Sequence, residues 1–405
     1  MPALPRPTGR TILFWLLGGL VMMLGMALGN QDLVWPAIFL VALPVVALLA
    51  LLVLRPQFTL VRTVEPAATS VREPATVQVT ATAVRPSPGG YVIAEDDPGA
   101  LLGPPHHARL FADRRGATTA TSYPVRARRR GRHTLDGFRI RFTDVLGFWV
   151  HTVRIAHPTP LVVTPAVVPL PSGRAAAYGA TGETPIPQTA VSGPDDVLVR
   201  EYQARDDVRR IHWPSTARSG TLMVRREEAA WDPTAWVLLD SRAGVHPSAR
   251  GEQPTFEWLV SAAASVGLRL LEDGYTVTLI DAEGTRHEVS SDRVGASAHW
   301  LEPLVDAEVA TVPDLHEATI RMAQASSENR VVALLGGLDR ATADLLAATT
   351  ASRHERTALT MAPEAESRPG FEDGRNVLVD HGWEVREVEA STDLAHVWGS
   401  LGVAR

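Results

Sequence analysis

The stretch that decides the fold of the C-terminal half reads AWVLLD at residues 235–240, TFEWLVSAAASVGLRLLE at 255–272 and YTVTLI at 275–280. The outer two segments are short apolar runs, which is typical of buried strands, and the middle segment has the length of a helix. Strand, helix, strand is the beginning of a parallel sheet. This part of the chain is therefore predicted to be an α/β domain.

The same alternation continues towards the C-terminus. The sequence predicts helices at 314–324, 339–351, 371–381 and 392–401, and strands at 330–335, 356–361 and 384–388. We expect an open doubly wound α/β domain with helices on both faces of the sheet. Ligand sites of this fold lie beyond the carboxyl ends of the strands, which directs attention to Asp240, Asp281 and the pair Gly336 and Gly337.

Residues 58–170 have a different pattern. Ala75–Val84 alternates apolar and polar residues, the period of a half-buried strand. Further strands are predicted at 121–126, 133–142, 149–155 and 161–164. The Pro and Gly residues between them favour a small antiparallel β-sandwich. Residues 86–105 are predicted to form a long loop that leads to two solvated loop histidines, His106 and His107.

Two uncharged apolar runs lie near the N-terminus, at 11–29 and 34–54. At about 1.5 Å per residue, the first spans roughly 28 Å, close to the hydrocarbon thickness of a bilayer. Only four residues separate the runs, so they predict an antiparallel transmembrane hairpin within residues 1–57. A cleaved signal peptide is the alternative interpretation of the first run.

The arginines around the two runs predict an orientation. Arg6 and Arg10 precede the first run, Arg55 and Arg62 follow the second, and the loop between them carries only Asp32. The positive-inside rule then places both ends of the hairpin in the cytoplasm. Gly25 and Gly29 have the spacing of a helix-packing GxxxG motif, although chance explains that spacing as well.

Composition excludes some classes of function. The net charge of -6 argues against general nucleic-acid binding, which needs a basic surface. The absence of cysteine excludes disulfides, thiolate zinc sites and a cysteine nucleophile. The sequence also contains no GxSxG elbow, HExxH motif, Walker loop or glycine fingerprint, so no catalytic residue is predicted.

Asp240 is the candidate metal ligand. It ends the first apolar strand, and the residues from Asp240 to Gly244 resemble the Asp-x-Ser-x-Ser turn that binds Mg²⁺ in von Willebrand factor A domains. Arg242 and Gly244 replace the two serines, so a cation stands where the metal would lie. A capping or ion-paired Asp240 is the structural alternative to a Mg²⁺ or Mn²⁺ ligand.

Ser192–Glu228 is the most highly charged part of the chain, with basic and acidic residues nearly in balance. Ile211 and Trp213 are predicted to be buried anchors, and Arg218 to bond a carboxylate such as Asp206 or Glu201. Two interpretations remain open. In the first, the ion pairs hold the segment against the α/β domain. In the second, the segment is an exposed docking surface for a partner.

This segment resembles the motif of the bacterial DUF58 family. The residues that carry the resemblance, as an interaction or structural motif, are Arg200, Glu201, Tyr202, Asp206, Asp207, Arg209, His212, Trp213, Arg218 and Arg225. Thr143, Asp144, Gly147 and Phe148 resemble the β-domain of the same family. Arg205 is a departure, because the family usually has glycine there.

The resemblance implies a multi-pass protein of the bacterial inner membrane, with cytoplasmic soluble domains and a von Willebrand A-like domain. It also implies a MoxR-type AAA ATPase as a partner, with a transglutaminase-like membrane protein as a further one. We therefore expect a non-enzymatic adaptor or scaffold without a cofactor. The alternatives are a Mg²⁺- or Mn²⁺-dependent binding module centred on Asp240, and a hydrolase or transferase that uses Asp240 or His212.

The expected organisation is that of an α+β multidomain protein. Its parts are a transmembrane hairpin at 1–57, a β-sandwich at 58–170, a linker at 171–191, and the charged segment with the von Willebrand A-like domain at 192–405.

Overall fold

The structure is a computed structural model of the 405-residue chain. It describes residues 4–87, 91–172, 199–201, 213–225, 234–247, 253–324, 330–349, 355–363 and 365–401. The chain is a mixed α/β protein with two apolar N-terminal helices and several sheets. It divides into unit 1, Met1–Val167 with Leu301–Ala307, and unit 2, Val168–Trp300 with Glu308–Arg405. Most of the predicted linker, 171–191, lies outside the described residues.

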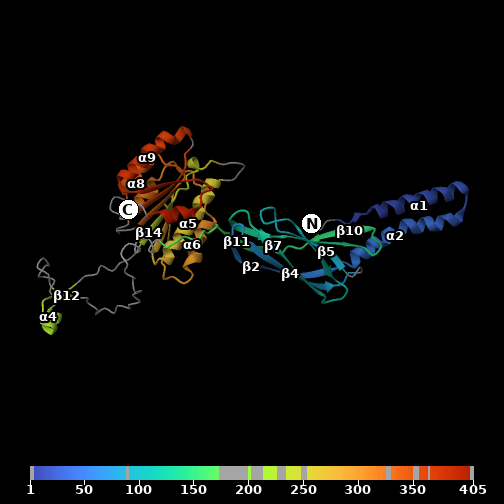
Figure 1. Ribbon diagram of the computed structural model, residues 1–405. Helices are drawn as coiled ribbons and strands as arrows, with labels where there is room; N and C mark the ends of the chain where they lie inside the picture. Colours follow the sequence, from blue (N-terminus) through green and yellow to red (C-terminus); the bar gives the residue numbers. More distant parts are fainter. Residues whose placement is uncertain are drawn as a thin grey trace. The chain divides into compact units, whose positions relative to one another are not determined.

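Unit 1 begins with the helices α1 (Gly9–Leu28) and α2 (Val34–Val53). Its strands are β1 (Arg6–Pro7), β2 (Gln57–Glu65), β3 (Ala68–Ser70), β4 (Pro74–Arg85), β5 (Tyr91–Asp97), β6 (His106–Phe111), β7 (Thr118–Arg126), β8 (Gly131–Leu135), β9 (Gly137–Thr143), β10 (Trp149–Arg154) and β11 (Thr159–Thr164). They form sheets of order β1-β10-β9-β5-β6, β2-β4-β7 and β3-β11-β8. Figure 1 shows these strands as one β-rich body next to the hairpin of α1 and α2.

One apolar core lies between the sheets of unit 1. Alternate residues of β4, including Val77, Val79 and Ala81, are buried, as the period-two pattern predicts. They share a cluster with residues of the other sheets, such as Phe138 and Leu161. The predicted strands at 75–84, 121–126, 149–155 and 161–164 are confirmed, and 133–142 is divided between β8 and β9.

The predicted loop at 86–105 is wrong in part, because it contains strand β5. Val92, Ala94 and Asp96 alternate inwards along this strand. The acidic run from Glu95 to Asp97 hides the pattern, since a buried aspartate is expected only with a partner. His106 and His107 begin strand β6, so they are not loop residues either.

The two apolar helices pack closely along Gly18. A Cβ atom there would lie 2.8 Å from a methyl carbon of Val41 and 3.3 Å from the carbonyl oxygen of Ala37. Gly29 has a different role from the GxxxG contact considered for it. Its φ of 65° closes the C-terminus of α1, and its N–H donates to the carbonyls of Gly25 and Met26.

The base of the hairpin is bonded to the turn before β10. Thr8 N donates to Phe148 O at 2.8 Å, and Thr8 Oγ1 donates to Gly147 O at 2.8 Å. Thr11 Oγ1 also donates to Phe148 O. From β10, Trp149 Nε1 donates to Pro44 O in α2 at 2.7 Å. Both helices are therefore fixed to the β-sheets of unit 1.

Unit 2 contains β12 (Val199–Glu201), β13 (Met223–Arg225), β14 (Thr234–Leu239), β15 (Thr276–Asp281), β16 (Arg286–Val289), β17 (Arg330–Leu335), β18 (Arg356–Met361) and β19 (Glu384–Val388). Its helices are α4 (Trp213–Ser219), α5 (Pro254–Glu272), α6 (Ala296–Val305, which ends in unit 1), α7 (His316–Ala323), α8 (Arg340–Thr349), α9 (Arg368–Asp380) and α10 (Leu394–Ser400). Six strands form one sheet, in the order β16-β15-β14-β17-β18-β19. All neighbours in it are parallel except β15 and β16.

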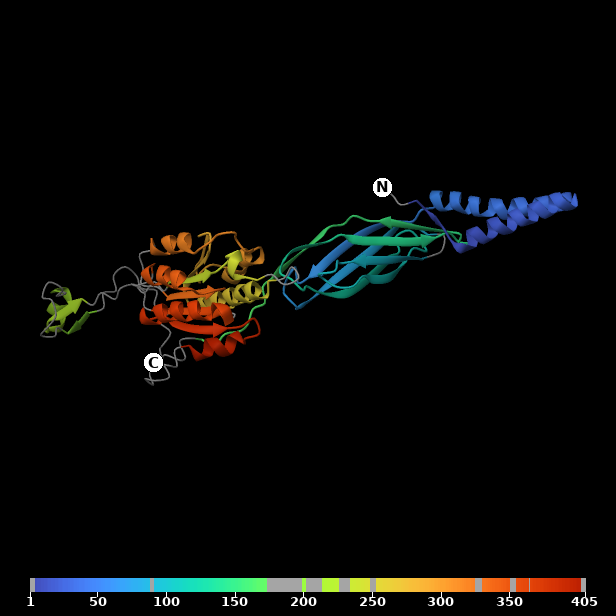
Figure 2. The same ribbon diagram turned by 90° about the horizontal axis from the view of Figure 1, so that it is seen from above.

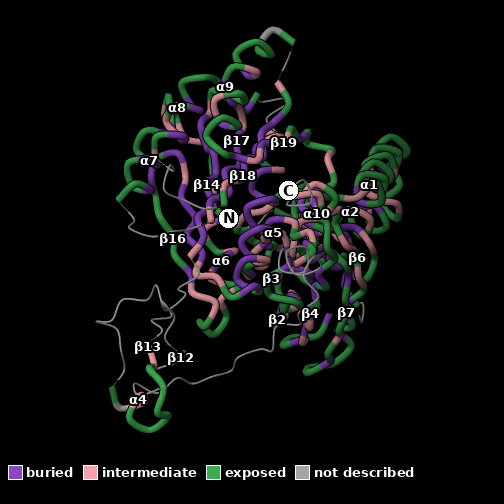
Figure 3. Tube along the Cα trace, turned by 60° about the vertical axis from the view of Figure 1, so that its left-hand side comes forward, coloured by how far each residue is buried: buried purple, intermediate pink, exposed green. Residues whose placement is uncertain are grey.

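Helices cover both faces of the six-stranded sheet. Trp236 and Leu238 of β14 share a core with residues of α7, α8 and α9. The alternate residues Val237 and Leu239 point to the opposite face, where α5 packs against β14, β15 and β17. Figure 2 shows helices on both sides of these strands, and Figure 3 shows the strands as the most buried part of the unit.

Gly267 of α5 generates a stability prediction. A Cβ atom there would lie 1.9 Å from the indole ring of Trp300, which is fully buried. We expect Gly267→Ala to lower the free energy of unfolding by about 1–3 kcal/mol through overpacking. The measurement is urea unfolding of the full chain in detergent.

Gly370→Ala is the matched control, because Gly370 is also helical and has nothing within 4 Å of the added Cβ. Because alanine has a higher helix propensity than glycine, we expect Gly370→Ala to raise the free energy of unfolding by up to about 1 kcal/mol. The prediction fails if Gly267→Ala is as stable as Gly370→Ala.

Candidate functional site

The candidate site lies at the carboxyl ends of the central strands of the six-stranded sheet. Asp240 follows β14 and is fully buried, and its N–H donates to Leu334 O of β17 at 2.9 Å. The neighbouring Ser241 and Arg242 are buried as well. A charged pair therefore stands at the position where a sheet of this kind carries its ligand site.

The Asp240 carboxylate is held by Arg242. Arg242 Nε donates to Oδ1 and Arg242 Nη2 donates to Oδ2, both at 2.8 Å, which is the bidentate geometry of an arginine–carboxylate pair. The N–H of Arg242 adds a bond to Oδ1 at 3.2 Å, and the N–H of Gly336 adds one to Oδ2 at 3.0 Å. Each carboxylate oxygen thus accepts two hydrogen bonds.

The guanidinium of Arg242 also reaches the turn after β17. Arg242 Nη2 donates to Gly337 O at 3.1 Å, and Arg242 Nη1 donates to Thr342 Oγ1 of α8 at 3.2 Å. Burial alone would lower the pKa of Arg242, but the hydrogen bonds and charge of Asp240 outweigh burial and raise it above its usual value. The arginine therefore stays charged.

Two further groups fix the turn and the start of α8. Ser241 Oγ accepts from the N–H of Ala282 beyond β15, at 3.2 Å. Asp339 Oδ1 accepts from the N–H of Thr342 at 2.8 Å. Burial would raise the pKa of Asp339, yet the hydrogen bonds from Thr342 and the charge of Arg242 lower it below its usual value. Asp339 therefore stays ionised and adds to the negative charge around Arg242.

His246 supports the same turn from the other side. Its ring nitrogens lie 2.7 Å from Asp240 O and 3.1 Å from Thr255 Oγ1. Burial is the main cause that lowers the pKa of His246, so the ring is neutral at pH 7. The sequence offered no pattern that singles out His246, because its only signal is a histidine six residues beyond a strand end.

The residues around Asp240 do not fit a Mg²⁺ or Mn²⁺ site. A hard cation needs several oxygen ligands with free lone pairs. Here the guanidinium of Arg242 occupies both carboxylate oxygens, and Ser241 Oγ already accepts from the main chain. Among the described residues, no group of three His, Asp or Glu side chains could hold a metal ion. The geometry therefore favours the ion-paired interpretation of Asp240.

The structure brings only some of the other candidate residues to Asp240. Gly336 and Gly337 join the site through their backbone, whereas Asp281 Oδ1 accepts from Thr285 N within its own turn. Five motif residues fall outside the described residues, and they are Tyr202, Asp206, Asp207, Arg209 and His212. The proposed bond of Arg218 to Asp206 and the burial of Ile211 fall outside them too.

The described part of the DUF58-like motif is a strand pair with one short helix. In the antiparallel pair of β12 and β13, Arg200 lies opposite Val224, Glu201 opposite Met223, and Val199 opposite Arg225. Trp213 and Arg218 belong to α4, which precedes β13. The predicted burial of Trp213 is wrong, since its exposed fraction is 66%. The residue type alone does not show whether a tryptophan lies in a core or on a surface.

Unit 1 contains a second buried ion pair, which the sequence did not reveal. Arg62 Nη2 donates to Asp96 Oδ1 at 2.5 Å, and Tyr123 OH donates to Asp96 Oδ2 at 2.7 Å. Arg62 Nη1 also donates to Leu135 O at 2.7 Å. Burial and the bond to Asp96 raise the pKa of Tyr123 far above its usual value. This arrangement bonds several strands of the β-rich core together.

The Asp240–Arg242 pair predicts an asymmetric mutational effect. Arg242→Ala leaves a buried carboxylate without its cation, so we expect a loss of about 3–5 kcal/mol in the free energy of unfolding. The double variant Asp240→Asn with Arg242→Met removes both charges and is expected to lose clearly less. Urea unfolding of the full chain measures both, and a loss below about 1 kcal/mol for Arg242→Ala would contradict the structural role.

His246 predicts a pH dependence of stability. Its folded pKa lies below the ordinary 6.5, so the unfolded chain binds a proton first as the pH falls. The contribution of His246 to the free energy of unfolding is therefore complete above about pH 6.5 and is lost progressively as the pH falls below that value. We expect His246→Asn to reduce the stability difference between about pH 7.5 and about pH 5.5 by about 1 kcal/mol.

The matching residue in unit 1 is His151, whose pKa is also lowered by burial. His151 lowers the stability of the parent chain and of the His246→Asn variant alike as the pH falls. The difference in stability between the two proteins therefore reports the effect of His246 alone. An unchanged pH profile in His246→Asn would show that this ring does not titrate on unfolding.

Comparison with solved structures gives only weak likenesses. A CARDB domain from Pyrococcus furiosus is 13% identical, with 27% of this chain and 93% of that chain covered at a TM-score of 0.18. A Listeria innocua beta-glucosidase is 12% identical, with 27% of this chain and 16% of that chain covered at 0.16. A Pseudomonas fluorescens alkylpurine DNA glycosylase is 14% identical, with 36% and 41% covered at 0.17. Scores this low carry no argument about fold or function.

No curated protein matches the chain. A family match begins within the charged segment and extends over most of the α/β domain, residues 198–393, and the family is described as Protein of unknown function DUF58. The match includes the motif residues from Arg200 to Arg225 and the Asp240 turn, so this part of the chain is similar to the DUF58 family.

Proposed function

We propose that this chain is a non-enzymatic integral membrane protein of the bacterial inner membrane that acts as an adaptor or scaffold. Its soluble parts face the cytoplasm, and its partner is a MoxR-type AAA ATPase. A transglutaminase-like membrane protein is a further candidate for the same assembly. The α/β domain, of von Willebrand A type, then acts without a metal ion.

The surface of the N-terminal helices supports the membrane part of the proposal. Gly9–Leu28 and Gln31–Val53 are long and apolar enough to cross a membrane, and most of their residues are not buried by the protein. Leu16, Met26 and Trp35 are among the exposed apolar side chains. Apolar surface of this extent is stable in lipid and costly in water.

The contacts at the hairpin base support a retained helix over a cleaved signal peptide. Thr8 and Thr11 of the α1 region bond to the turn before β10, and Phe14 packs edge-on against Phe148 at 4.9 Å. Cleavage after α1 would remove these contacts. The hairpin is therefore proposed to be part of the mature protein.

The exposed part of the DUF58 motif carries the adaptor proposal. Trp213 is 66% exposed and Leu222 is 44% exposed, and Arg218 is exposed at the end of the same short helix. Tryptophan and arginine are enriched among the residues that dominate binding energy at protein interfaces. The Met223 N–H donates to Thr216 Oγ1 at 3.0 Å, which ties helix α4 to strand β13. This hydrogen bond holds α4 against β13, while the side chains of Trp213 and Arg218 remain exposed.

The Asp240 geometry supports the absence of catalysis at this edge of the sheet. A carboxylate with every oxygen engaged, beside a charged Arg242, is poorly placed to act as a base or nucleophile. The pair resembles a structural counterpart of a metal site, in which the guanidinium supplies the positive charge.

Site-specific crosslinking in native membranes tests the adaptor proposal. A photoreactive residue at position 213 is expected to capture the AAA ATPase, whereas one at Val379, an exposed position on α9, is not. Because the docking residues carry much of the binding energy, Arg218→Ala is expected to weaken enrichment of the ATPase about tenfold or more. No enrichment over the Arg218→Ala variant would contradict the proposal.

A further inference from the structure

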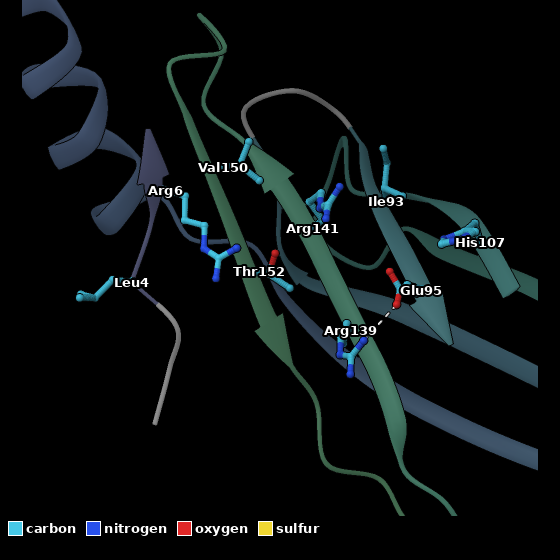
Figure 4. Close-up of a pocket in the computed structure, with 9 residues that line it drawn as sticks. All are labelled: Leu4, Arg6, Ile93, Glu95, His107, Arg139, Arg141, Val150 and Thr152. Atoms are coloured by element: carbon cyan, nitrogen blue, oxygen red, sulfur yellow. Dashed lines mark hydrogen bonds and ion pairs between the residues drawn. The ribbon is translucent and has the colours of Figure 1, made fainter. Parts of the chain in front are cut away.

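A basic pocket lies on the outer face of the five-stranded sheet of unit 1. Its volume is about 430 Å³, and Figure 4 shows the side chains that line it, from β1, β10, β9, β5 and β6 and from Leu4 before β1. None of its lining residues belongs to the Asp240 site or to the DUF58 motif. Its polar lining is dominated by Arg6, Arg139 and Arg141.

Strand register brings these arginines together. Arg6 of β1 lies opposite Val150 of β10, and Arg141 of β9 lies between Thr152 of β10 and Ile93 of β5. Residues alternate between the faces of a sheet, so the neighbours of Arg139 and Arg141 along β9, such as Ile140, point into the core. The guanidinium groups consequently share the outer face.

The pocket has an excess of positive charge. Arg139 Nη1 donates to Glu95 Oε1 at 3.1 Å, which neutralises one cation. Arg6 and Arg141 form no ion pair with any carboxylate of the described residues. Guanidinium groups recognise phosphate oxygens through paired N–H donors, so the pocket has the chemistry of a phosphate site.

The pocket lies beside the base of the transmembrane hairpin. Arg6 is three residues before the start of α1, and the next turn of the chain is bonded to Gly147 and Phe148. A pair of aromatic side chains lies at the base of the hairpin, where Trp15 of α1 packs edge-on against Trp149 of β10 at 6.1 Å. Aromatic residues of this kind gather at membrane interfaces, where lipid headgroups lie.

The apolar part of the lining decides which phosphate compound fits. Leu4 is 85% exposed and Ile93 is 45% exposed, and both line the pocket with Val150. Free phosphate would leave these side chains in water. A phospholipid places its phosphate against the arginines and its apolar portion against Leu4 and Ile93, so the lining matches an amphiphile.

We propose that this pocket binds the phosphate headgroup of an anionic phospholipid of the leaflet next to unit 1. The inference rests on the proposed membrane anchorage and is independent of the protein partner. Bound lipid would fix the β-sheets of unit 1 against the membrane surface. Arg6 and Arg141 hold the phosphate, and Glu95 restrains Arg139.

Lipid titration of the purified full chain in a non-ionic detergent tests the proposal. The probes are short-chain phosphatidylglycerol, phosphatidylcholine with the same acyl chains, and inorganic phosphate. We expect saturable binding of phosphatidylglycerol, weaker binding of phosphatidylcholine, and little binding of inorganic phosphate. The double variant Arg6→Gln with Arg141→Gln is expected to weaken phosphatidylglycerol binding at least about tenfold, because two charge-assisted contacts are lost.

The control is Arg126→Gln with Arg128→Gln, which removes the same charge from the most arginine-rich run of the sequence. Arg126 and Arg128 are exposed, and neither lines the pocket. This control is expected to bind phosphatidylglycerol as the parent chain does. Glu95→Gln is expected to tighten binding several-fold, since it releases Arg139, an effect that a merely structural role of Glu95 would not produce.

Three outcomes would overturn the proposal. They are equal affinity for the two lipids, equal loss in both double variants, and saturation by inorganic phosphate at the same concentration as by phosphatidylglycerol. The last result would assign the pocket to a soluble phosphate compound. Membrane fractionation of the same proteins separates this failure from that of the anchorage, because a chain that is anchored without binding lipid remains in the membrane fraction.

Discussion

The ion pair between Asp240 and Arg242 is the interaction on which the carboxyl edge of the six-stranded sheet depends. A carboxylate that is fully buried needs both hydrogen bonds and a counter-charge. Arg242 supplies the charge, and its remaining N–H groups bond to Gly337 and Thr342 in the next crossover. The loops after β14 and β17 are thereby tied to α8. The position that holds a ligand in related sheet topologies is here filled by the chain itself.

The same physical solution recurs in unit 1 with different partners. Arg62 and Asp96 lie on strands of different sheets, and their pairing allows an acidic residue to point into an apolar core. Tyr123 from a third strand completes the carboxylate's bonds. Buried pairs of this kind add little net stability compared with an apolar core, but a wrong strand register would leave a charge unpaired. They therefore specify the packing of the sheets.

The apolar strands of unit 2 could be predicted from the sequence almost to the residue, because runs such as 330–335 and 356–361 are continuous and buried on both faces. Asp240 could also be placed at the sheet edge from its position after such a run. Strand β5 was hidden, because its inward Asp96 is acceptable only beside Arg62. The burial of Trp213 could not be judged, since composition does not say which side of a short helix meets a core. Contacts between residues far apart in sequence, such as His246 with Thr255 or Arg242 with Thr342, need the folded backbone.

The hairpin of unit 1 is bonded to the β-sheets along part of its length, so it is more than a flexible tether. Trp149 reaches Pro44, which lies well inside α2, and Thr11 bonds within the first turn of α1. Any membrane that surrounds these helices must therefore meet the sheet β1-β10-β9-β5-β6 in a fixed orientation. The arginines proposed to bind a lipid headgroup are dispersed in sequence. The run from Arg126 to Arg132 is the densest group of arginines in the sequence. It belongs to β7, β8 and the turn between them, and neither strand is part of the sheet β1-β10-β9-β5-β6. Arg6 and Arg141 become neighbours only because strand pairing places β1 and β9 on either side of β10.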